Sequence, residues 1–137
     1  MQTVLVVEDS KLLRVEREHT LKKAGYLVLT AVDGVEALSV AHESHPDLIL
    51  LDMMLPKLSG QEVLQRLRAH PSSVSTPVIV LTSLPESNRE KLLGEGASLY
   101  FEKSLLRLEN GSGPLLDAIE TLLARRVRVK AAASPAI

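Results

Sequence analysis

The sequence has 137 residues, close to the roughly 150 expected for one domain, which excludes a separate output domain. Apolar residues make up 45% and charged residues 24%, with a formal net charge of -1, which excludes disorder throughout and nucleic-acid binding over the whole surface. The lack of cysteine excludes disulfides and thiolate sites, and no apolar run reaches the roughly 18 residues of a membrane span, so we expect a cytoplasmic protein with no membrane partner.

Five short apolar runs predict the strands of a parallel sheet, and helical patterns separate them. The expected strands cover residues 3–7, 27–31, 48–51, 78–81 and 99–102. The second and fifth runs are more mixed, as expected of strands nearer the sheet edge. The helices are expected over residues 10–24 and 34–44, after Ser59, over residues 86–95, and around the last apolar stripe.

Local signals define the helix ends. Gly25 is a natural C-terminal cap, and Pro46 stops the second helix. The segments that begin at Asp33 and Ser59 each have the pattern of a capping box, with Glu three residues later. The apolar residues that follow a helical spacing are Val35, Leu38, Ala41, Val63, Leu64, Leu67, Leu115, Leu116, Ile119, Leu122 and Leu123.

Strict alternation of strands and helices predicts an α/β fold, in which a doubly wound parallel sheet carries helices on both faces. In such sheets, ligands bind outside the carboxyl ends of the strands, where the winding direction reverses. We expect one domain over residues 1–127, followed by a basic, alanine-rich and mobile tail over residues 128–137.

Polar residues follow four of the five predicted strands. They are Glu8, Asp9, Asp52, Thr82 and Lys103. Each one alone could be a helix cap, a turn residue or a solvated charge. Their convergence is the informative feature, because the fold brings three carboxylates, a hydroxyl and an ammonium group to one edge of the sheet.

The three carboxylates predict a site for a hard divalent cation. Two carboxylates about 4 Å apart repel by about 4 kcal/mol at an effective dielectric constant of 20, so three need compensation. Mg²⁺ binds one or two carboxylates together with phosphate oxygens, and we expect Mn²⁺ to substitute for it. A carboxylate beside the metal can attack phosphorus and form an aspartyl phosphate, with Lys103 supplying a second positive charge and Thr82 contacting the phosphoryl group.

With these residues in place, the sequence closely resembles the receiver domain of bacterial two-component response regulators, including the single-domain chemotaxis type. The resemblance covers about residues 2–126 and rests on VLVVEDS (4–10), DLILLDMMLPKLSG (47–60), PVIVLTS (77–83) and GASLYFEK (96–103). It implies a flavodoxin-like three-layer sandwich with a five-stranded sheet in the order 2-1-3-4-5.

The resemblance also implies the roles of the acidic residues. Asp52 is the phospho-acceptor, and a sensor histidine kinase or phosphotransfer protein supplies the phosphoryl group from a phosphohistidine. Asp9, Asp52 and the backbone carbonyl of Met54 bind Mg²⁺, and Glu8 acts through water. This chemistry is signalling rather than enzyme turnover, limited to self-catalysed phosphoryl transfer and slow self-dephosphorylation.

A conformational switch is implied as well. Lys103 contacts the phosphoryl group, Thr82 moves towards it, and Tyr100 swings inward. The surface of helix 4, strand 5 and helix 5 then changes, and an unknown downstream protein reads it. We expect a monomer or weak dimer without direct nucleic-acid binding. Met54 and Leu84 flank the route of an attacking water and are apolar, which predicts the slow phosphate loss.

Three alternatives stay open at this stage. Receivers usually have proline after the lysine, whereas Ser104 stands here, so a phosphorylation-independent interaction domain of the same fold is one alternative. An aspartate-nucleophile phosphohydrolase would need a second acid at Met54. A flavin-binding module would need a glycine-rich phosphate loop and more aromatic residues than the 2% present.

Two further features have ordinary explanations. His19, His42, His45 and His70 are scattered and are expected to be solvated surface residues. The basic run over residues 125–130 lies near the end of the last helix, where the helix dipole favours cations.

Overall fold

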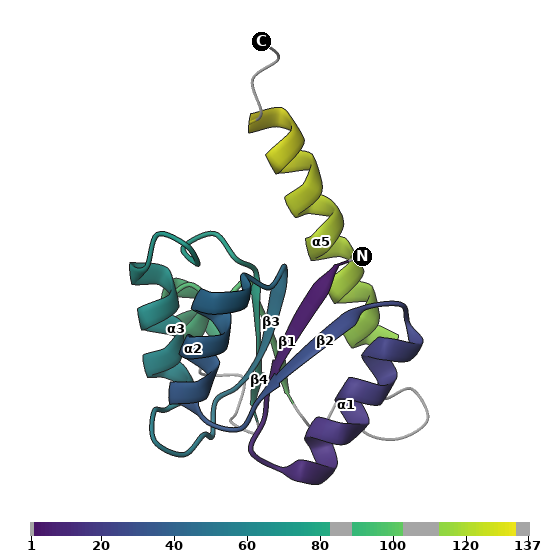
Figure 1. The fold of residues 1–137 in the computed structure, drawn as a ribbon. Helices are drawn as coiled ribbons and strands as arrows, with labels where there is room; N and C mark the ends of the chain where they lie inside the picture. Colours follow the sequence, from purple (N-terminus) through teal and green to yellow (C-terminus); the bar gives the residue numbers. More distant parts are fainter. Residues whose placement is uncertain (1, 83–88, 103–112, 134–137) are drawn as a thin grey trace.

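Five parallel strands form one sheet in the order β2-β1-β3-β4-β5, which confirms the implied topology (Figure 1). The strands are β1 (Thr3–Val7), β2 (Leu27–Ala31), β3 (Leu48–Asp52), β4 (Val78–Thr82) and β5 (Leu99–Glu102). The helices are α1 (Lys11–Lys23), α2 (Gly34–Ser44), α3 (Gly60–Ala69), α4 (Arg89–Gly94) and α5 (Gly113–Ala133). This computed structural model describes residues 2–82, 89–102 and 113–133.

The central strands are buried on both faces, as their unbroken apolar runs predict. Every residue of β3 and β4 is buried, whereas β2 and β5, at the two edges, are mostly half-buried. Both central strands continue one residue past their apolar runs, because Asp52 pairs with Leu81 and Thr82 pairs with Glu102 in the parallel ladder. The ladder therefore holds two polar residues in regular strand geometry.

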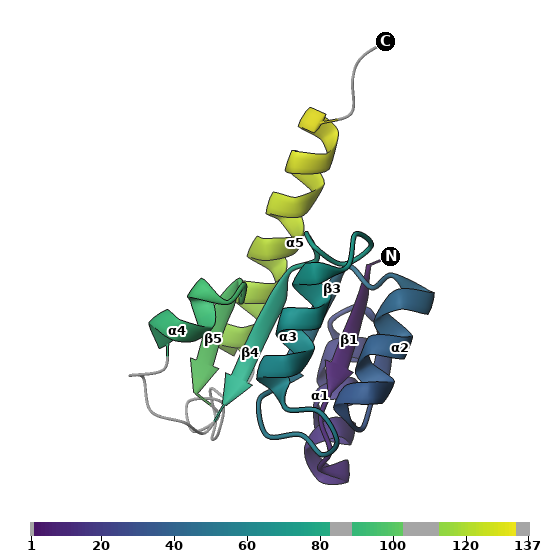
Figure 2. The same cartoon turned by 90° about the vertical axis from the view of Figure 1, so that its left-hand side faces the viewer.

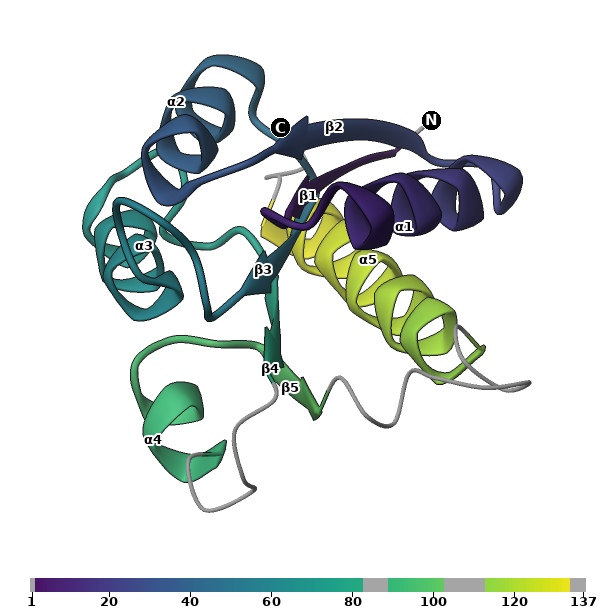
Figure 3. The same cartoon turned by 90° about the horizontal axis from the view of Figure 1, so that it is seen from below.

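Alternate residues of each strand belong to two separate cores, one on each side of the sheet. Figure 3 shows α2, α3 and α4 on one side of the sheet and α1 and α5 on the other. One core contains Leu5, Ile49 and Val80 together with apolar side chains of α2, α3 and α4. The opposite core contains residues of α1 and α5, including Leu21 and Ile119. The two cores make the three-layer sandwich that the sequence implied.

Capping side chains begin three of the helices. The Ser10 hydroxyl accepts a hydrogen bond from the Leu13 N–H at 3.4 Å, Asp33 Oδ1 accepts from the Glu36 N–H at 2.8 Å, and Ser59 Oγ accepts from the Glu62 N–H at 3.2 Å. The predicted apolar positions of α3 and α5 face the core. Val35 does not, since 52% of it is exposed.

Val35 lies off the buried face of α2 because this face is made by Gly34, Ala37 and Ala41, each three or four residues from the next. Small residues there let the helix approach the sheet closely. Only Val35 was therefore assigned to the wrong side of the helix, since Ala41 is buried and Leu38 packs against the core as predicted.

Helix α5 continues to Ala133 and projects beyond the amino ends of the strands (Figure 2). The boundary placed at residue 127 therefore falls inside a helix, because residues 128–133 are mostly good helix formers. Residues 134–137 lie outside the described residues. Within residues 2–82, 89–102 and 113–133, no helix has the length and apolar character needed to cross a membrane.

Candidate functional site

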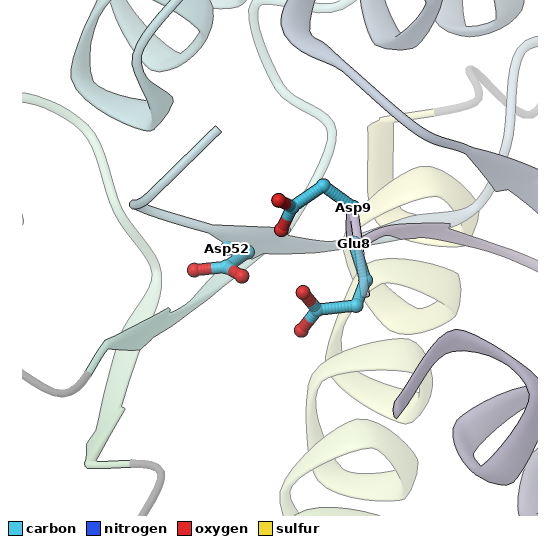
Figure 4. A group of neighbouring side chains, drawn as sticks. All are labelled: Glu8, Asp9 and Asp52. Atoms are coloured by element: carbon cyan, nitrogen blue, oxygen red, sulfur yellow. The ribbon is translucent and has the colours of Figure 1, made fainter. Parts of the chain in front are cut away.

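Three carboxylates meet where β1 and β3 end (Figure 4). Glu8 and Asp9 directly follow β1, and Asp52 is the last residue of β3. Because β1 and β3 are neighbours in the sheet, with Val7 opposite Leu51, the three side chains lie close together. One oxygen of each carboxylate lies within 4.8 Å of the others.

The cluster has a buried side and an open side. Glu8 and Asp52 are each only 1% exposed, whereas Asp9 is exposed to solvent. Figure 4 shows the carboxylates of Glu8 and Asp9 both turned towards Asp52. A phosphate group or an ion arriving from solvent would therefore meet the cluster from the side of Asp9.

Backbone groups hold the two buried carboxylates in place. Asp52 Oδ1 accepts a hydrogen bond from the Met54 N–H at 3.0 Å, and Glu8 Oε2 accepts one from the Ser10 N–H at 3.2 Å. The Met54 side chain is 62% exposed. Gly60 stabilises the loop after β3, since its N–H donates to the Met53 carbonyl at 3.1 Å.

Mg²⁺ fits the three carboxylates. It prefers carboxylate, carbonyl and water oxygens as ligands. The three carboxylates provide such oxygens within 4.8 Å of one another, at the end of the sheet that opens to solvent at Asp9. Their crowding also needs a positive charge to offset mutual repulsion.

Glu8 already contacts one positive charge. Arg17, two turns into α1, forms an ion pair with Glu8 Oε1, and the side chains of Arg17 and Glu8 are 12% and 1% exposed. Arg14 also donates to the Glu8 carbonyl oxygen at 3.0 Å. Arg17 was not predicted as a site residue, because the sequence signals it only as a cation in the helix that follows the acidic pair.

Two further predicted site residues lie on β4 and β5, the next strands along the sheet. Thr82 ends β4, the strand next to β3, and is fully buried. Tyr100 lies on β5 opposite Val80 and is half-buried against the core on the α2, α3 and α4 side. Lys103 and Ser104 lie outside the described residues, as does Leu84, so the structure neither places the lysine nor describes its peptide bond.

The chain matches proteins of one family. The model of the response regulator receiver domain family matches residues 4–109. Protein PilG of Pseudomonas aeruginosa is 41% identical over 80 residues, which make up 58% of this chain and 59% of PilG. The chain therefore spans less than two thirds of that relative.

Solved structures of receivers share the fold. The chemotaxis protein CheY4 of Vibrio cholerae superimposes with a TM-score of 0.78 at 31% identity, over 89% of this chain and 98% of CheY4. The response regulator TrrA of Thermotoga maritima, solved in complex with Mg²⁺-BeF, gives a TM-score of 0.76 at 29% identity, over 89% of this chain and 99% of TrrA.

Proposed function

Because the chain belongs to the response regulator receiver domain family, whose members signal through phosphorylation, we propose that Asp52 is its phospho-acceptor. The observation that carries this proposal is the position of Asp52. It ends a central strand, is 1% exposed, and lies beside two further carboxylates. Receiver domains are signalling domains rather than conventional enzymes, so the phosphorylated receiver itself would carry the signal.

Glu8, Asp9 and Asp52 would hold Mg²⁺, and we include the Met54 backbone carbonyl among its ligands and assign Glu8 a contact through water. The metal would supply positive charge between the acceptor carboxylate and the incoming phosphoryl group. This supports attack by an Asp52 oxygen, since two negative groups otherwise repel each other. The three carboxylates support the choice of Mg²⁺, because carboxylate oxygens are among the ligands that this ion prefers.

The donor in this proposal is a phosphohistidine of a sensor histidine kinase or phosphotransfer protein. An Asp52 oxygen bonds to phosphorus while the bond from phosphorus to the imidazole nitrogen breaks, and the electron pair stays on that nitrogen. The Met54 N–H donates to Asp52 Oδ1 and so helps to orient the carboxylate. Lys103 supplies the second positive charge at the phosphoryl oxygens.

The response to phosphorylation is a shift between two conformations. Thr82 ends the strand beside the acceptor, and Tyr100 lies one strand further along, so a phosphoryl group that contacts Thr82 can bias the position of Tyr100. The surface of α4, β5 and α5 then regulates an unidentified downstream protein. We place the receiver within residues 1–127 and expect a monomer or weak dimer.

Intact mass after incubation with acetyl phosphate tests the acceptor. The wild-type chain should gain the mass of one phosphoryl group with Mg²⁺ and none after chelation of the metal. Asp52→Asn should remain unlabelled and keep the circular dichroism spectrum of the folded protein. Asp117→Asn, which changes an exposed carboxylate on α5, should be labelled as the wild type is.

The alternative of a phosphorylation-independent domain is favoured by Ser104 in place of the usual proline. It requires that the wild type stay unlabelled in the same experiment. Labelling that persists in Asp52→Asn would instead assign the acceptor to another residue.

A further inference from the structure

The cluster of Glu8, Asp9 and Asp52 has a positively charged neighbour, Arg17, on its buried side. The Arg17 guanidinium pairs with Glu8 Oε1, and both side chains are largely removed from solvent. Glu8 also belongs to the group of three carboxylates whose oxygens lie within 4.8 Å of one another. Any cation bound by that group therefore shares Glu8 with Arg17.

The geometry of α1 explains how a residue nine positions later reaches Glu8. Side chains on a helix lean towards its amino end, and α1 begins three residues after Glu8. Arginine at this position extends back along the helix to the carboxylate. A guanidinium, which presents its donors in a rigid planar fork, is well suited to pair with a buried carboxylate.

We propose that Arg17 is a built-in counter-ion that takes part of the role of Mg²⁺. It stabilises the cluster when no metal is bound, and by sharing Glu8 it lowers the affinity of the site for Mg²⁺. This inference rests on the magnesium site proposed above. Arg17 is a positioning residue, because it acts through Glu8 and not on the phosphoryl group.

The charges of the cluster explain why Arg17 should stabilise the metal-free protein and lower its affinity for Mg²⁺. Among the described residues of the cluster, three carboxylates are offset by one guanidinium, which pairs with Glu8. Without Arg17 the buried Glu8 carboxylate would lose this ion pair, and the site would carry one more negative charge, so a bound cation would be attracted more strongly. Loss of Arg17 should therefore weaken the metal-free fold and strengthen metal binding.

Arg17→Met tests this, because methionine keeps much of the apolar stem and removes the charge. Mg²⁺ binding is measured by titration calorimetry at pH 8, and the melting temperature is measured with and without Mg²⁺. We expect the variant to bind Mg²⁺ about tenfold more tightly than the wild type and to melt at a lower temperature without metal. Added Mg²⁺ should raise its melting temperature by more than it raises that of the wild type.

Lys22→Met is the matched control. It removes one cation from the same helix, but Lys22 pairs with Glu18 at 3.0 Å and its side chain is 59% exposed. Its Mg²⁺ affinity should equal that of the wild type, which separates a contact through Glu8 from a general change in charge. Arg17→Lys retains the charge and should keep the affinity within about threefold of the wild-type value.

A double-mutant cycle keeps the test decisive if Arg17→Met folds poorly. In a Glu8→Gln background, Arg17→Met should change Mg²⁺ affinity by less than about twofold, because the shared carboxylate is gone. Unchanged or weaker Mg²⁺ binding by Arg17→Met, while the wild type binds normally, would overturn the role of Arg17 alone. A wild type that binds no Mg²⁺ would overturn the metal site proposed above together with this inference.

Discussion

At the scale of single residues, we expect Met54, which lies two residues after Asp52, to influence the lifetime of a phosphoryl group on Asp52. Its N–H donates to Asp52 Oδ1 at 3.0 Å, and its side chain is 62% exposed. A thioether is only a weak hydrogen-bond acceptor, so it cannot hold a water molecule in line with phosphorus. The exposed position lets the side chain be changed without disturbing the core.

Replacement of Met54 by a polar residue should shorten the lifetime of the aspartyl phosphate. Met54→Asn places an amide where it can orient water, and we expect phosphate loss about tenfold faster, less than a full general base contributes. Met54→Leu is the control and should decay at the wild-type rate. The decay of the phosphorylated mass after donor removal measures both, and equal rates for Asn and Leu would contradict this account.

The residues of the site differ in how far sequence could predict them. Glu8, Asp9 and Asp52 were predictable because each follows an apolar run, and parallel strands place their carboxyl ends together. Arg17 and Arg68 were not, because their partners come from the tertiary fold. Arg68 of α3 donates to the carbonyl oxygens of Gly96 at 2.9 Å and Thr76 at 2.7 Å. The sequence around Arg68 does not predict either contact.

At the scale of elements, two glycines fix the loop between β3 and α3. A Cβ atom on Gly60 would lie 2.6 Å from both the Asp52 carbonyl oxygen and the Met53 Cα. A Cβ atom on Gly34, at the start of α2, would lie 2.5 Å from Leu58 Cβ. The loop therefore packs closely against the end of β3 and against α2, which holds Asp52 and Met54 in place.

Gly60→Ala should lower the free energy of unfolding by about 1–3 kcal/mol, since the backbone of β3 and the loop must move apart. Gly94→Ala is the matched control, because nothing lies within 4 Å of a Cβ atom there, and its effect should stay within about 0.5 kcal/mol. Urea unfolding of the two variants checks both values. Equal stability of Gly60→Ala and the wild type would show that the loop is not packed as described.

Helices α2 and α3 are also joined by a pair of histidines. The rings of His42 and His70 stack with centroids 4.0 Å apart, and within the described residues the buried His42 Nε2 has no hydrogen-bond partner. Burial, followed by the charges of His70 and His45, lowers the pKa of His42 below its usual value of 6.5. The expectation that His42 is simply solvated was therefore wrong.

This shift predicts how stability responds to acid. Between the lowered pKa and about 6.5, the unfolded chain binds a proton at His42 more readily than the folded chain, so the free energy of unfolding falls as pH falls through that range. His42→Gln should lose less stability than the wild type between pH 7.5 and about pH 5.5. His19→Gln, at an exposed position of α1, should behave as the wild type. Parallel pH profiles for wild type and His42→Gln would refute the prediction.

At the scale of the whole molecule, the alternation of strands and helices along the chain could be predicted from apolar patterning, whereas the order of strands in the sheet was implied by the family resemblance. The length of α5 could not be predicted. The apolar stripe read from the sequence ends at Leu123, whereas the helix continues to Ala133. Apolar patterning reports packing against the sheet, so it does not mark where a projecting helix stops.

In our account, the fold positions the site residues for one reaction, the transfer of a phosphoryl group to Asp52. The sheet brings three distant segments together at the carboxyl ends of β1, β3 and β4, so the acceptor, the acidic pair and the Thr82 hydroxyl occupy one edge. A test of the account must therefore identify the bond that forms, since a gain in mass alone does not locate it.

Reduction with borohydride after incubation with acetyl phosphate and Mg²⁺ identifies that bond directly, because it converts a phosphorylated aspartate into homoserine. Peptide mapping by mass spectrometry should then find homoserine at position 52, and aspartate at position 9. Homoserine at position 9, or at neither position in a protein that has bound Mg²⁺, would contradict the assignment of Asp52 as the phospho-acceptor.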